Sequence, residues 1–159
     1  DFSPERIVPD CIRAASEGRD VVLRNPASTR PYQHVLEPLS AYLRIAHAQA
    51  CDASLAGSYN VGPADSDCVT TGELAELFCR AWGEGASWRA EEECAAPHEA
   101  GFLKLDSSRI EARLGWQPRW HIEEAIARTV DWAKAWRAGE DVGDVMETQI
   151  AAYFGEAEA

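Results

Sequence analysis

Hydrophobic residues recur at three- and four-residue spacing in several stretches of the chain, and this spacing predicts amphipathic helices. The predicted helices cover residues 4–17, 35–51, 70–82, 107–114, 121–136 and 141–154. Shorter runs rich in β-branched and aromatic residues, bounded by turn residues, predict four strands. We expect these strands at residues 21–24, 57–62, 87–91 and 102–105. Helices that alternate with short strands are typical of the α/β or α+β class.

Polar residues and glycines mark where these helices begin and end. Ser3 is expected to cap the first helix, with Pro4 at its first position. Thr70 or Thr71 is expected to cap the third helix, and Gly115 to end the fourth.

The composition is that of a folded protein. The chain has 159 residues, of which 46% are hydrophobic, so residues 1–159 are expected to form one domain with a sizeable core. Its five cysteines are scattered without a CxxC pair, which favours reduced thiols in the cytoplasm over a zinc site or disulfide framework. No run approaches the roughly 18 apolar residues of a membrane helix. Because the first residue is Asp1 and not Met, we expect a piece of a longer protein.

The balance of charge argues against nucleic acid as a partner. Lys and Arg total 15 and Asp and Glu total 27, which gives a formal net charge of −12. Such a chain repels phosphate backbones at long range, whereas a small anion can still bind where an arginine overrules the distant field.

The stretch NPASTRPYQHVLEPL, residues 25–39, is the best candidate for such a local site. Pro26 and Pro31 bracket Arg30, a short β-prone run precedes the loop, and a helix begins near His34. An arginine in a restrained loop beside a helix start suits an anion. From the residues alone, a solvated arginine or a salt bridge remains open.

Several motifs are missing. No strand is followed by GxGxxG, and there is no Walker loop, SxxK, GxSxG or HExxH. The sequence therefore predicts no catalytic, cofactor-binding or metal-binding residue in this chain. Glu91, Glu92 and Glu93 are interpreted as a solvated edge, and Phe102 as part of the core.

Three segments carry a family resemblance: IVPDCIRAASEGRDVVLRNPASTRPYQHVLEPLSAYL, GSYNVGP and PHEAGFLKLDSSRIEARLGWQPRW. Together they resemble the C-terminal half of extended short-chain dehydrogenases/reductases that act on nucleotide sugars. Pro31 stands where most relatives carry Asp, and RPYQHV with PHEA is most similar to the branch of this family that dehydrates CDP-glucose. The resemblance runs from Asp1 to about Tyr153.

The resemblance implies an α/β substrate-binding domain that closes over a CDP-sugar. It also implies an N-terminal Rossmann domain outside this chain, which holds NAD and the catalytic residues, so no cofactor is expected here. The implied chemistry is an internal redox cycle that removes water across C5 and C6 of the sugar. Separated from that domain, the chain is expected to expose an apolar face and form a homo-oligomer.

By the same resemblance, eight residues are expected to contact the nucleotide sugar: Val22, Leu23, Asn25, Arg30, His34, Asn60, His98 and Glu99. Arg30 is expected on the diphosphate, and the backbone of residues 22–23 on the nucleobase. For His34 the alternative is a structural role, for Asn60 a buried amide bonded to the backbone, and for Asn25 a residue that merely turns the chain.

Two other functions remain open at this point. One keeps the fold but changes the substrate to that of another nucleotide-sugar epimerase or dehydratase. The other is an α/β binding module without chemistry.

Overall fold

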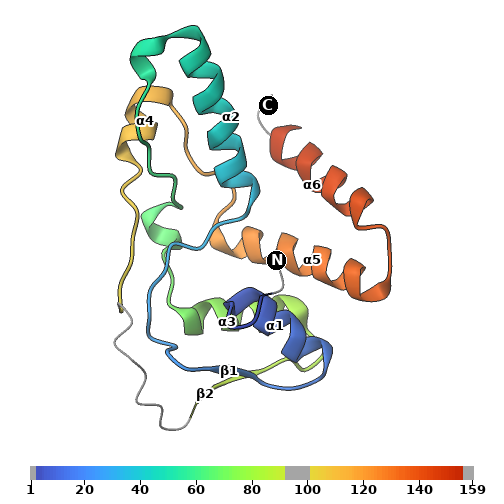
Figure 1. Ribbon diagram of the computed structural model, residues 1–159. Helices are drawn as coiled ribbons and strands as arrows, with labels where there is room; N and C mark the ends of the chain where they lie inside the picture. The colour runs from blue at the N-terminus through green and yellow to red at the C-terminus, as the bar shows by residue number, and fades with distance from the viewer. Residues whose placement is uncertain (1–2, 92–100, 156–159) are drawn as a thin grey trace.

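The structure is a computed structural model, and it describes residues 3–91 and 101–155 (Figure 1). Its helices and strands follow in the order α1 (Ile7–Ser16), β1 (Val21–Leu23), α2 (Leu36–Cys51), α3 (Thr71–Trp82), β2 (Trp88–Ala90), α4 (Ser108–Leu114), α5 (Ile122–Ala138) and α6 (Val142–Gly155). Two short 3-10 turns, η1 (Ala53–Leu55) and η2 (Asp65–Asp67), lie between α2 and α3. No helix in the described ranges is both long enough and apolar enough to cross a membrane.

The larger core lies where α1, α3 and α5 pack with a small parallel sheet (Figure 1). Strand β1 pairs with β2 in the register Val21↔Trp88 and Leu23↔Ala90. Val21 and Leu23 are buried while Val22 is exposed, so β1 turns one face to the core. Cys11 and Cys79 are buried in this core, at positions that the helical pattern makes apolar.

Two smaller apolar clusters build the rest of the molecule. One joins α2 to α4 through Ala41, Ile110 and Trp116. Helix α4 ends at Gly115, whose φ of 59° is the left-handed cap that the sequence predicts. The other cluster joins the start of α2 to α6 through Trp120 and Tyr153, whose rings meet edge to face at 5.0 Å.

A buried carboxyl group links these clusters. Glu37 has no exposed surface, and its Oε1 accepts hydrogen bonds from the backbone N–H groups of Arg119 (3.1 Å) and Trp120 (2.8 Å). Its Oε2 accepts the hydroxyl of Tyr153 at 2.8 Å. Burial, above all, raises the pKa of Tyr153 to about 12, so this hydroxyl keeps the proton that it donates. One side chain thus ties α2 to the segment before α5 and to α6.

Two of the four predicted strands are wrong. Residues 57–62 form no strand with the described residues. Their backbone bonds side chains instead: the Gly62 N–H donates to Ser107 Oγ at 2.9 Å, and the Val61 carbonyl accepts the Gln33 side-chain amide at 3.1 Å. At residues 102–105 only Phe102 pairs, in a single bridge to Thr29. Phe102 is also 65% exposed, so its expected place in the core is wrong. Its ring extends from an edge segment, a placement that hydrophobicity alone does not reveal.

The first helix begins later than predicted. Its N-cap is Arg6, and Glu5 has a φ of 64°, which breaks helical geometry between Ser3 and Ile7. Ser3 therefore does not cap it. The third helix does begin as predicted, with Thr70 and Glu73 in a capping box.

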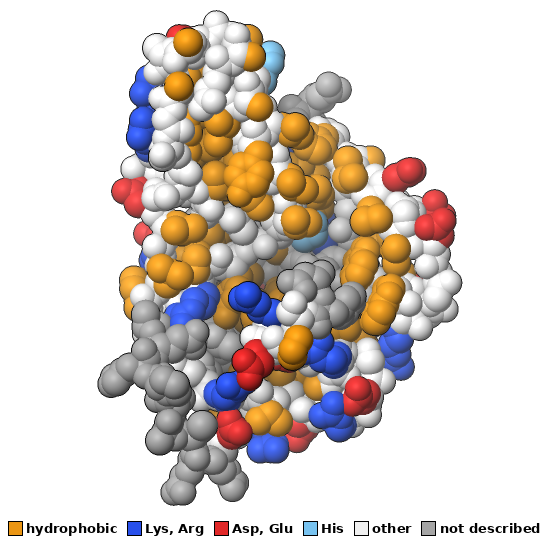
Figure 2. Space-filling model, viewed as in Figure 1, with side chains coloured by type: hydrophobic (Ala, Val, Ile, Leu, Met, Phe, Trp, Pro, Cys, Tyr) orange, Lys and Arg blue, Asp and Glu red, His pale blue; other side chains and the backbone are white. Residues whose placement is uncertain are grey.

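Helix α2 exposes much of its apolar face. The spacing of Val35, Leu39, Tyr42 and Leu43 is that of one helix face, yet all four are between 46% and 67% exposed. On α6, Met146, Ile150 and Phe154 are exposed in the same way. Figure 2 shows hydrophobic side chains gathered over this part of the molecule. We call these seven residues the α2/α6 apolar face.

Replacing Glu37 tests whether its buried carboxyl group holds the clusters together. Glu37→Ala leaves two buried N–H groups and the Tyr153 hydroxyl without their acceptor, so we expect the free energy of unfolding to fall by about 3 kcal/mol. Chemical denaturation measures this loss. Glu147→Ala, at an exposed position of α6, is the control and should change stability by no more than about 0.5 kcal/mol. Equal, small losses in the two variants would show that the network contributes little.

Candidate functional site

The candidate site is built around residues 24–34, here called the Arg30 loop. Thr29 lies at its centre and forms bridges with two distant segments, antiparallel to Thr70 and parallel to Phe102. The Thr29 N–H donates to the Gly101 carbonyl at 3.0 Å, and the Leu103 N–H donates to the Thr29 carbonyl at 3.1 Å. The Arg30 N–H donates to Val69 at 3.2 Å. The loop is thus held on both sides by backbone hydrogen bonds.

The start of α3 is occupied by this same loop. The N–H groups of Thr71 and Gly72 donate to the carbonyls of Ser28 (2.9 Å) and Pro26 (2.8 Å). First-turn N–H groups are the ones that would otherwise bind an anion. At the start of α2, His34 occupies the first N–H groups. Its Nδ1 accepts the Leu36 N–H at 3.3 Å, and its carbonyl accepts the Glu37 N–H at 3.0 Å. The expected help from a helix start is therefore wrong, and the cationic group at this place is Arg30.

Arg30 is half-buried, and one guanidinium N–H donates to the Thr29 carbonyl at 3.0 Å. That contact holds the side chain along its own loop. Arginine carries five N–H donors in a planar fork, a geometry that suits a phosphate. Phe102 and Lys104 lie beside the loop, with the Lys104 ammonium 5.7 Å from the centre of the exposed Phe102 ring. Sequence reasoning missed this aromatic–cation pair because it placed Phe102 in the core.

His34 is buried, with 7% of its surface exposed, and its ring meets Trp120 edge to face at 4.9 Å. Burial, with a smaller contribution from the charge of Arg128, lowers the pKa of His34 to about 4. The imidazole is therefore neutral at pH 7. This placement agrees with the structural role of His34 at the start of α2.

The two strand residues of the predicted site differ in exposure. Val22 is 44% exposed and Leu23 is buried. The sheet uses one edge of β1, where the Leu23 carbonyl accepts the Glu91 N–H at 2.8 Å. Among the described residues the other edge of β1 meets no strand, so its backbone groups face outward from the sheet.

Asn25 and Asn60 hold the chain locally. The Asn25 carbonyl accepts the Ser28 N–H at 3.3 Å and the Ser28 hydroxyl at 3.1 Å, which closes the first turn of the loop. Asn60 is exposed and donates from Nδ2 to the Asp106 carbonyl at 3.2 Å. His98 and Glu99 lie outside the described residues.

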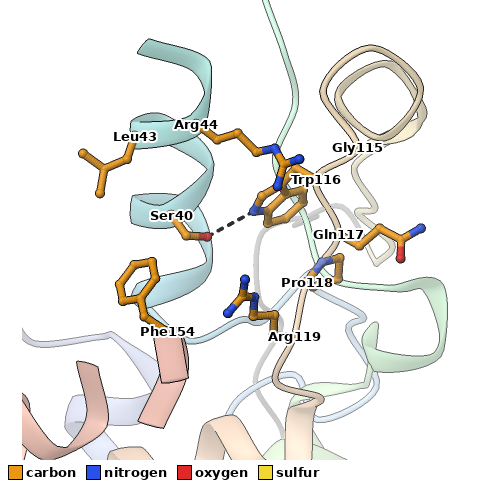
Figure 3. Close-up of a pocket in the computed structure, with 9 residues that line it drawn as sticks. All are labelled: Ser40, Leu43, Arg44, Gly115, Trp116, Gln117, Pro118, Arg119 and Phe154. Carbon is orange, nitrogen blue, oxygen red and sulfur yellow. Dashed lines mark hydrogen bonds between the residues drawn. The ribbon is translucent and has the colours of Figure 1, made fainter. Parts of the chain in front are cut away.

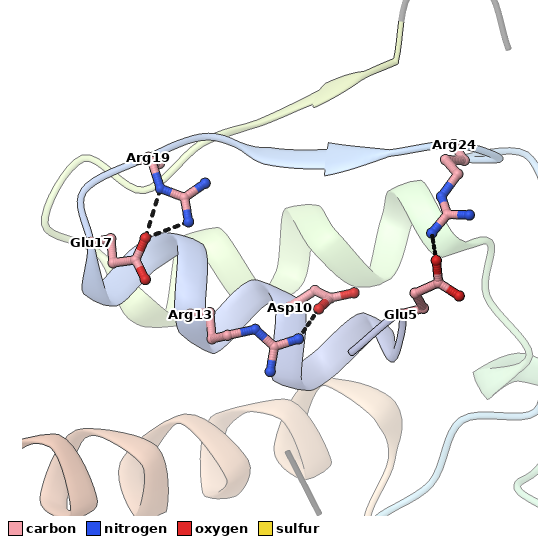
Figure 4. Close-up of polar contacts among 6 residues, drawn as sticks. All are labelled: Glu5, Asp10, Arg13, Glu17, Arg19 and Arg24. Carbon is pink, nitrogen blue, oxygen red and sulfur yellow. Dashed lines mark hydrogen bonds and ion pairs between the residues drawn. The ribbon is translucent and has the colours of Figure 1, made fainter. Parts of the chain in front are cut away.

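Acidic partners accompany three arginines near the N-terminus, Arg13, Arg19 and Arg24. Arg24, at the edge of the loop, bonds Glu5 at 2.8 Å, and Figure 4 shows this pair beside Asp10–Arg13 and Glu17–Arg19. Exposed pairs of this kind contribute little to stability.

Two hollows on the described surface have no predicted site residue in their lining. The first, of about 480 Å³, lies between α2, residues 115–119 and α6 (Figure 3). Its two arginines each bond the last turn of a helix: Arg44 donates to the Leu114 carbonyl and Arg119 to the Tyr153 carbonyl, both at 2.6 Å. These contacts identify them as partners of helix C-termini.

The second hollow, of about 770 Å³, is lined by Lys104 and His121 among others. His121 Nδ1 lies 2.8 Å from Asp67 Oδ2, and Asp67 Oδ1 accepts the Ile122 N–H at 3.2 Å, so Asp67 caps α5. The hydrogen bond and charge of Asp67 raise the pKa of His121. Within residues 3–91 and 101–155, no three His, Cys, Asp or Glu side chains gather closely enough to hold a metal ion.

Comparison with known proteins confirms the resemblance predicted from the sequence. The chain is 40% identical over 155 residues to CDP-glucose 4,6-dehydratase of Salmonella typhimurium, a match that covers 97% of this chain and 43% of the relative. The chain thus spans less than half the length of the curated relative it matches. No family model matches the sequence.

Solved structures share the fold. dTDP-glucose 4,6-dehydratase from Bacillus anthracis, in complex with NAD, superposes with a TM-score of 0.64 at 19% identity, over 82% of this chain and 39% of that one. UDP-glucuronic acid 4-epimerase from Bacillus cereus, in complex with UDP-glucuronic acid and NAD, gives a TM-score of 0.69 at 14% identity, over 84% and 41%. The fold of this chain is therefore shared with part of each of these two enzymes.

Opposite shifts of two histidines provide a test of this geometry. His34 should stay neutral until the pH approaches about 4, whereas His121 should titrate above its ordinary value of 6.5. Burial of neutral His34 therefore contributes stability above pH 6.5 that is lost as the pH falls towards 4, where the unfolded chain already binds a proton. The His121 pair contributes below pH 6.5, and its contribution is lost as the pH rises through the folded pKa.

Histidine NMR signals followed against pH measure both values. Asp67→Asn should return the pKa of His121 towards 6.5 and leave that of His34 unchanged. A His34 signal that titrates near 6.5 in the folded protein would contradict the buried placement.

Proposed function

We propose that this chain is the nucleotide-sugar-binding part of a CDP-glucose 4,6-dehydratase, a lyase that converts CDP-glucose to CDP-4-keto-6-deoxyglucose and water. The observation that carries the proposal is the 40% identity to the Salmonella enzyme over 97% of the chain. The Arg30 loop supports it, because RPYQHV lies inside that match and presents a guanidinium on a backbone held at both sides.

In this proposal Arg30 holds the diphosphate. The fork of a guanidinium can donate two parallel hydrogen bonds to phosphate oxygens. The nucleobase lies against residues 22–23 of β1, where Val22 offers its backbone groups on the free edge and the Leu23 carbonyl is already bonded to Glu91, and Asn25 reaches the ribose. Asn60, His98 and Glu99 complete the contacts. His34 supports the site indirectly, because its ring and carbonyl accept the first N–H groups of α2 and so fix the end of the Arg30 loop.

NAD does not fit the described residues of this chain. A dinucleotide's pyrophosphate binds at the free N-terminus of a helix that follows a strand. Here the first N–H groups of α3 already bond Pro26 and Ser28, and those of α2 bond His34. We therefore assign the cofactor, and with it the catalytic residues, to a Rossmann domain that completes the enzyme, and we expect this chain alone to be inactive.

The α2/α6 apolar face is the surface that such a domain would cover. Its seven side chains are exposed in this chain, and residues 57–62 form no strand with the described residues. The share of the relative that lies outside the match leaves room for that domain.

A second candidate keeps the fold and changes the base. The Bacillus cereus neighbour binds UDP-glucuronic acid, so a uridine nucleotide is the first alternative ligand to test.

Calorimetric titration of the chain with CDP, UDP and dTDP tests the proposal. We expect CDP to bind most tightly, and Arg30→Ala to weaken it by about tenfold or more, since a charge-assisted hydrogen bond to a phosphate is lost. Arg19→Ala removes an exposed arginine paired with Glu17 and should leave binding unchanged. Tighter binding of UDP than CDP would favour the second candidate, and equal CDP affinity in Arg30→Ala would remove the loop from the site.

Self-association of the isolated chain tests the apolar face. We expect sedimentation to show dimers or larger species at high concentration, because the face covers two neighbouring helices. Leu43→Glu, at a position 67% exposed, should shift the chain towards monomer without loss of stability. Ala112→Glu adds the same charge on the exposed side of α4, outside the apolar face, and should leave the self-association of the chain unchanged. A parent chain that stays monomeric at high concentration would contradict this expectation.

A further inference from the structure

Three hydroxyl groups meet where the Arg30 loop crosses the start of α3. Thr71 Oγ1 lies 2.9 Å from Ser28 Oγ and 3.0 Å from the Tyr32 hydroxyl, and it donates to the Ser28 carbonyl at 3.1 Å. Ser28 Oγ in turn donates to the Asn25 carbonyl at 3.1 Å. Each hydroxyl has one proton, so three protons serve these four contacts: Tyr32 donates to Thr71, Ser28 donates to the Asn25 carbonyl, and Thr71 shares its proton between the carbonyl and hydroxyl oxygens of Ser28.

This cluster spans the residues on both sides of Arg30. Ser28 is buried, with 4% of its surface exposed, and lies two positions before Arg30; Tyr32 lies two positions after it. Both contact the same atom of Thr71. A single side chain on a helix thus fixes the two ends of the segment that carries the guanidinium.

Thr71 is not needed to cap its own helix. That role belongs to Thr70, whose hydroxyl accepts the Glu73 N–H at 3.2 Å while the Thr70 N–H donates to the Glu73 carboxylate at 2.7 Å. The Thr71 hydroxyl serves the loop instead. Gly72 follows it, and a Cβ at that position would lie 3.2 Å from the Pro26 carbonyl, so the helix start and the loop are in close contact.

We propose that Thr71 is the positioning residue of the nucleotide site, because its hydroxyl joins Ser28 to Tyr32 and so sets where Arg30 presents its guanidinium. The proposal deepens the proposed function and rests on it for the ligand, a nucleoside diphosphate. The loop geometry that it invokes does not depend on the ligand. Thr71 acts through Arg30 and is not itself expected to contact phosphate.

Three variants of the 159-residue chain separate this role from helix stability. Thr71→Val keeps the shape and removes the hydroxyl, and Thr71→Ser keeps the hydroxyl. Glu73→Ala weakens the same helix start by breaking the capping box while leaving the three hydroxyls in place. All three are compared with the parent by hydrogen exchange of residues 28–32 and by calorimetric titration with CDP.

We expect Thr71→Val to speed amide exchange at Thr29 and Arg30 by about tenfold, because it removes a shared hydrogen-bond partner. The affinity for CDP should fall by a similar factor. Thr71→Ser should restore both, and Glu73→Ala should change neither by more than about twofold. Unchanged exchange in Thr71→Val would overturn the proposal, as would a Glu73→Ala variant that loosens the loop equally.

The two measurements also distinguish this proposal from the proposed function. Faster exchange in Thr71→Val, with no CDP binding by any variant or the parent, would support the control of the loop by Thr71 and count against the nucleotide site. Faster exchange with CDP affinity equal to that of the parent would overturn the link between Thr71 and binding.

Discussion

The carboxyl group of Glu37 is the contact through which the separate parts of this fold become one structure. It is fully buried on α2, accepts two backbone N–H groups from the segment that leads into α5, and accepts the hydroxyl of Tyr153 on α6. Burying a polar group is costly unless its hydrogen bonds are made, so these three partners are fixed relative to α2. The apolar clusters around Trp116 and Trp120 then pack on either side of this fixed point.

The candidate site is held in place by the two helices on which the Arg30 loop is anchored. The Arg30 loop enters α2 through His34 and crosses the start of α3 through Ser28, so both of its ends depend on helices whose positions the cores determine. The loop carbonyls occupy the first N–H groups of α3, which removes that helix end as an anion site, so the proposed anion contact falls to the Arg30 side chain. The hydrogen bonds that occupy the helix-end donors hold the loop in place, and a rigid loop suits the proposed role of binding a sugar nucleotide.

Sequence periodicity predicted α3 and α5 well because each has a buried face of its own. The strong spacing from Leu74 to Trp82 and from Ile122 to Val130 belongs to residues that do meet in the larger core. Residues 57–62 were predicted as a strand by composition, but a strand needs a neighbour, and composition cannot say whether one is present. The face of α2 shows the same limit: its spacing is helical, and the partner that the spacing implies is not among the described residues.

The site was predictable in part. Arg30 stood out because two prolines bracket it, and its placement on a restrained loop agrees with that pattern. The hydroxyl cluster could not be found from the sequence, because Ser28 and Thr71 are 43 residues apart and meet only once α3 packs beside the loop. Phe102 was misplaced for a related reason, since a hydrophobic residue on an edge segment has the same composition signal as one in a core.

The most direct test of the central claim is to map CDP onto the chain by NMR. If the Arg30 loop is the nucleotide site, adding CDP should shift the backbone amide signals of residues 22–32 and 101–104. Those of residues 115–119, which line the hollow with Arg44, should stay in place. Saturable shifts confined to the hollow would contradict the account. So would an absence of shifts at CDP concentrations at which calorimetry shows the chain to be saturated.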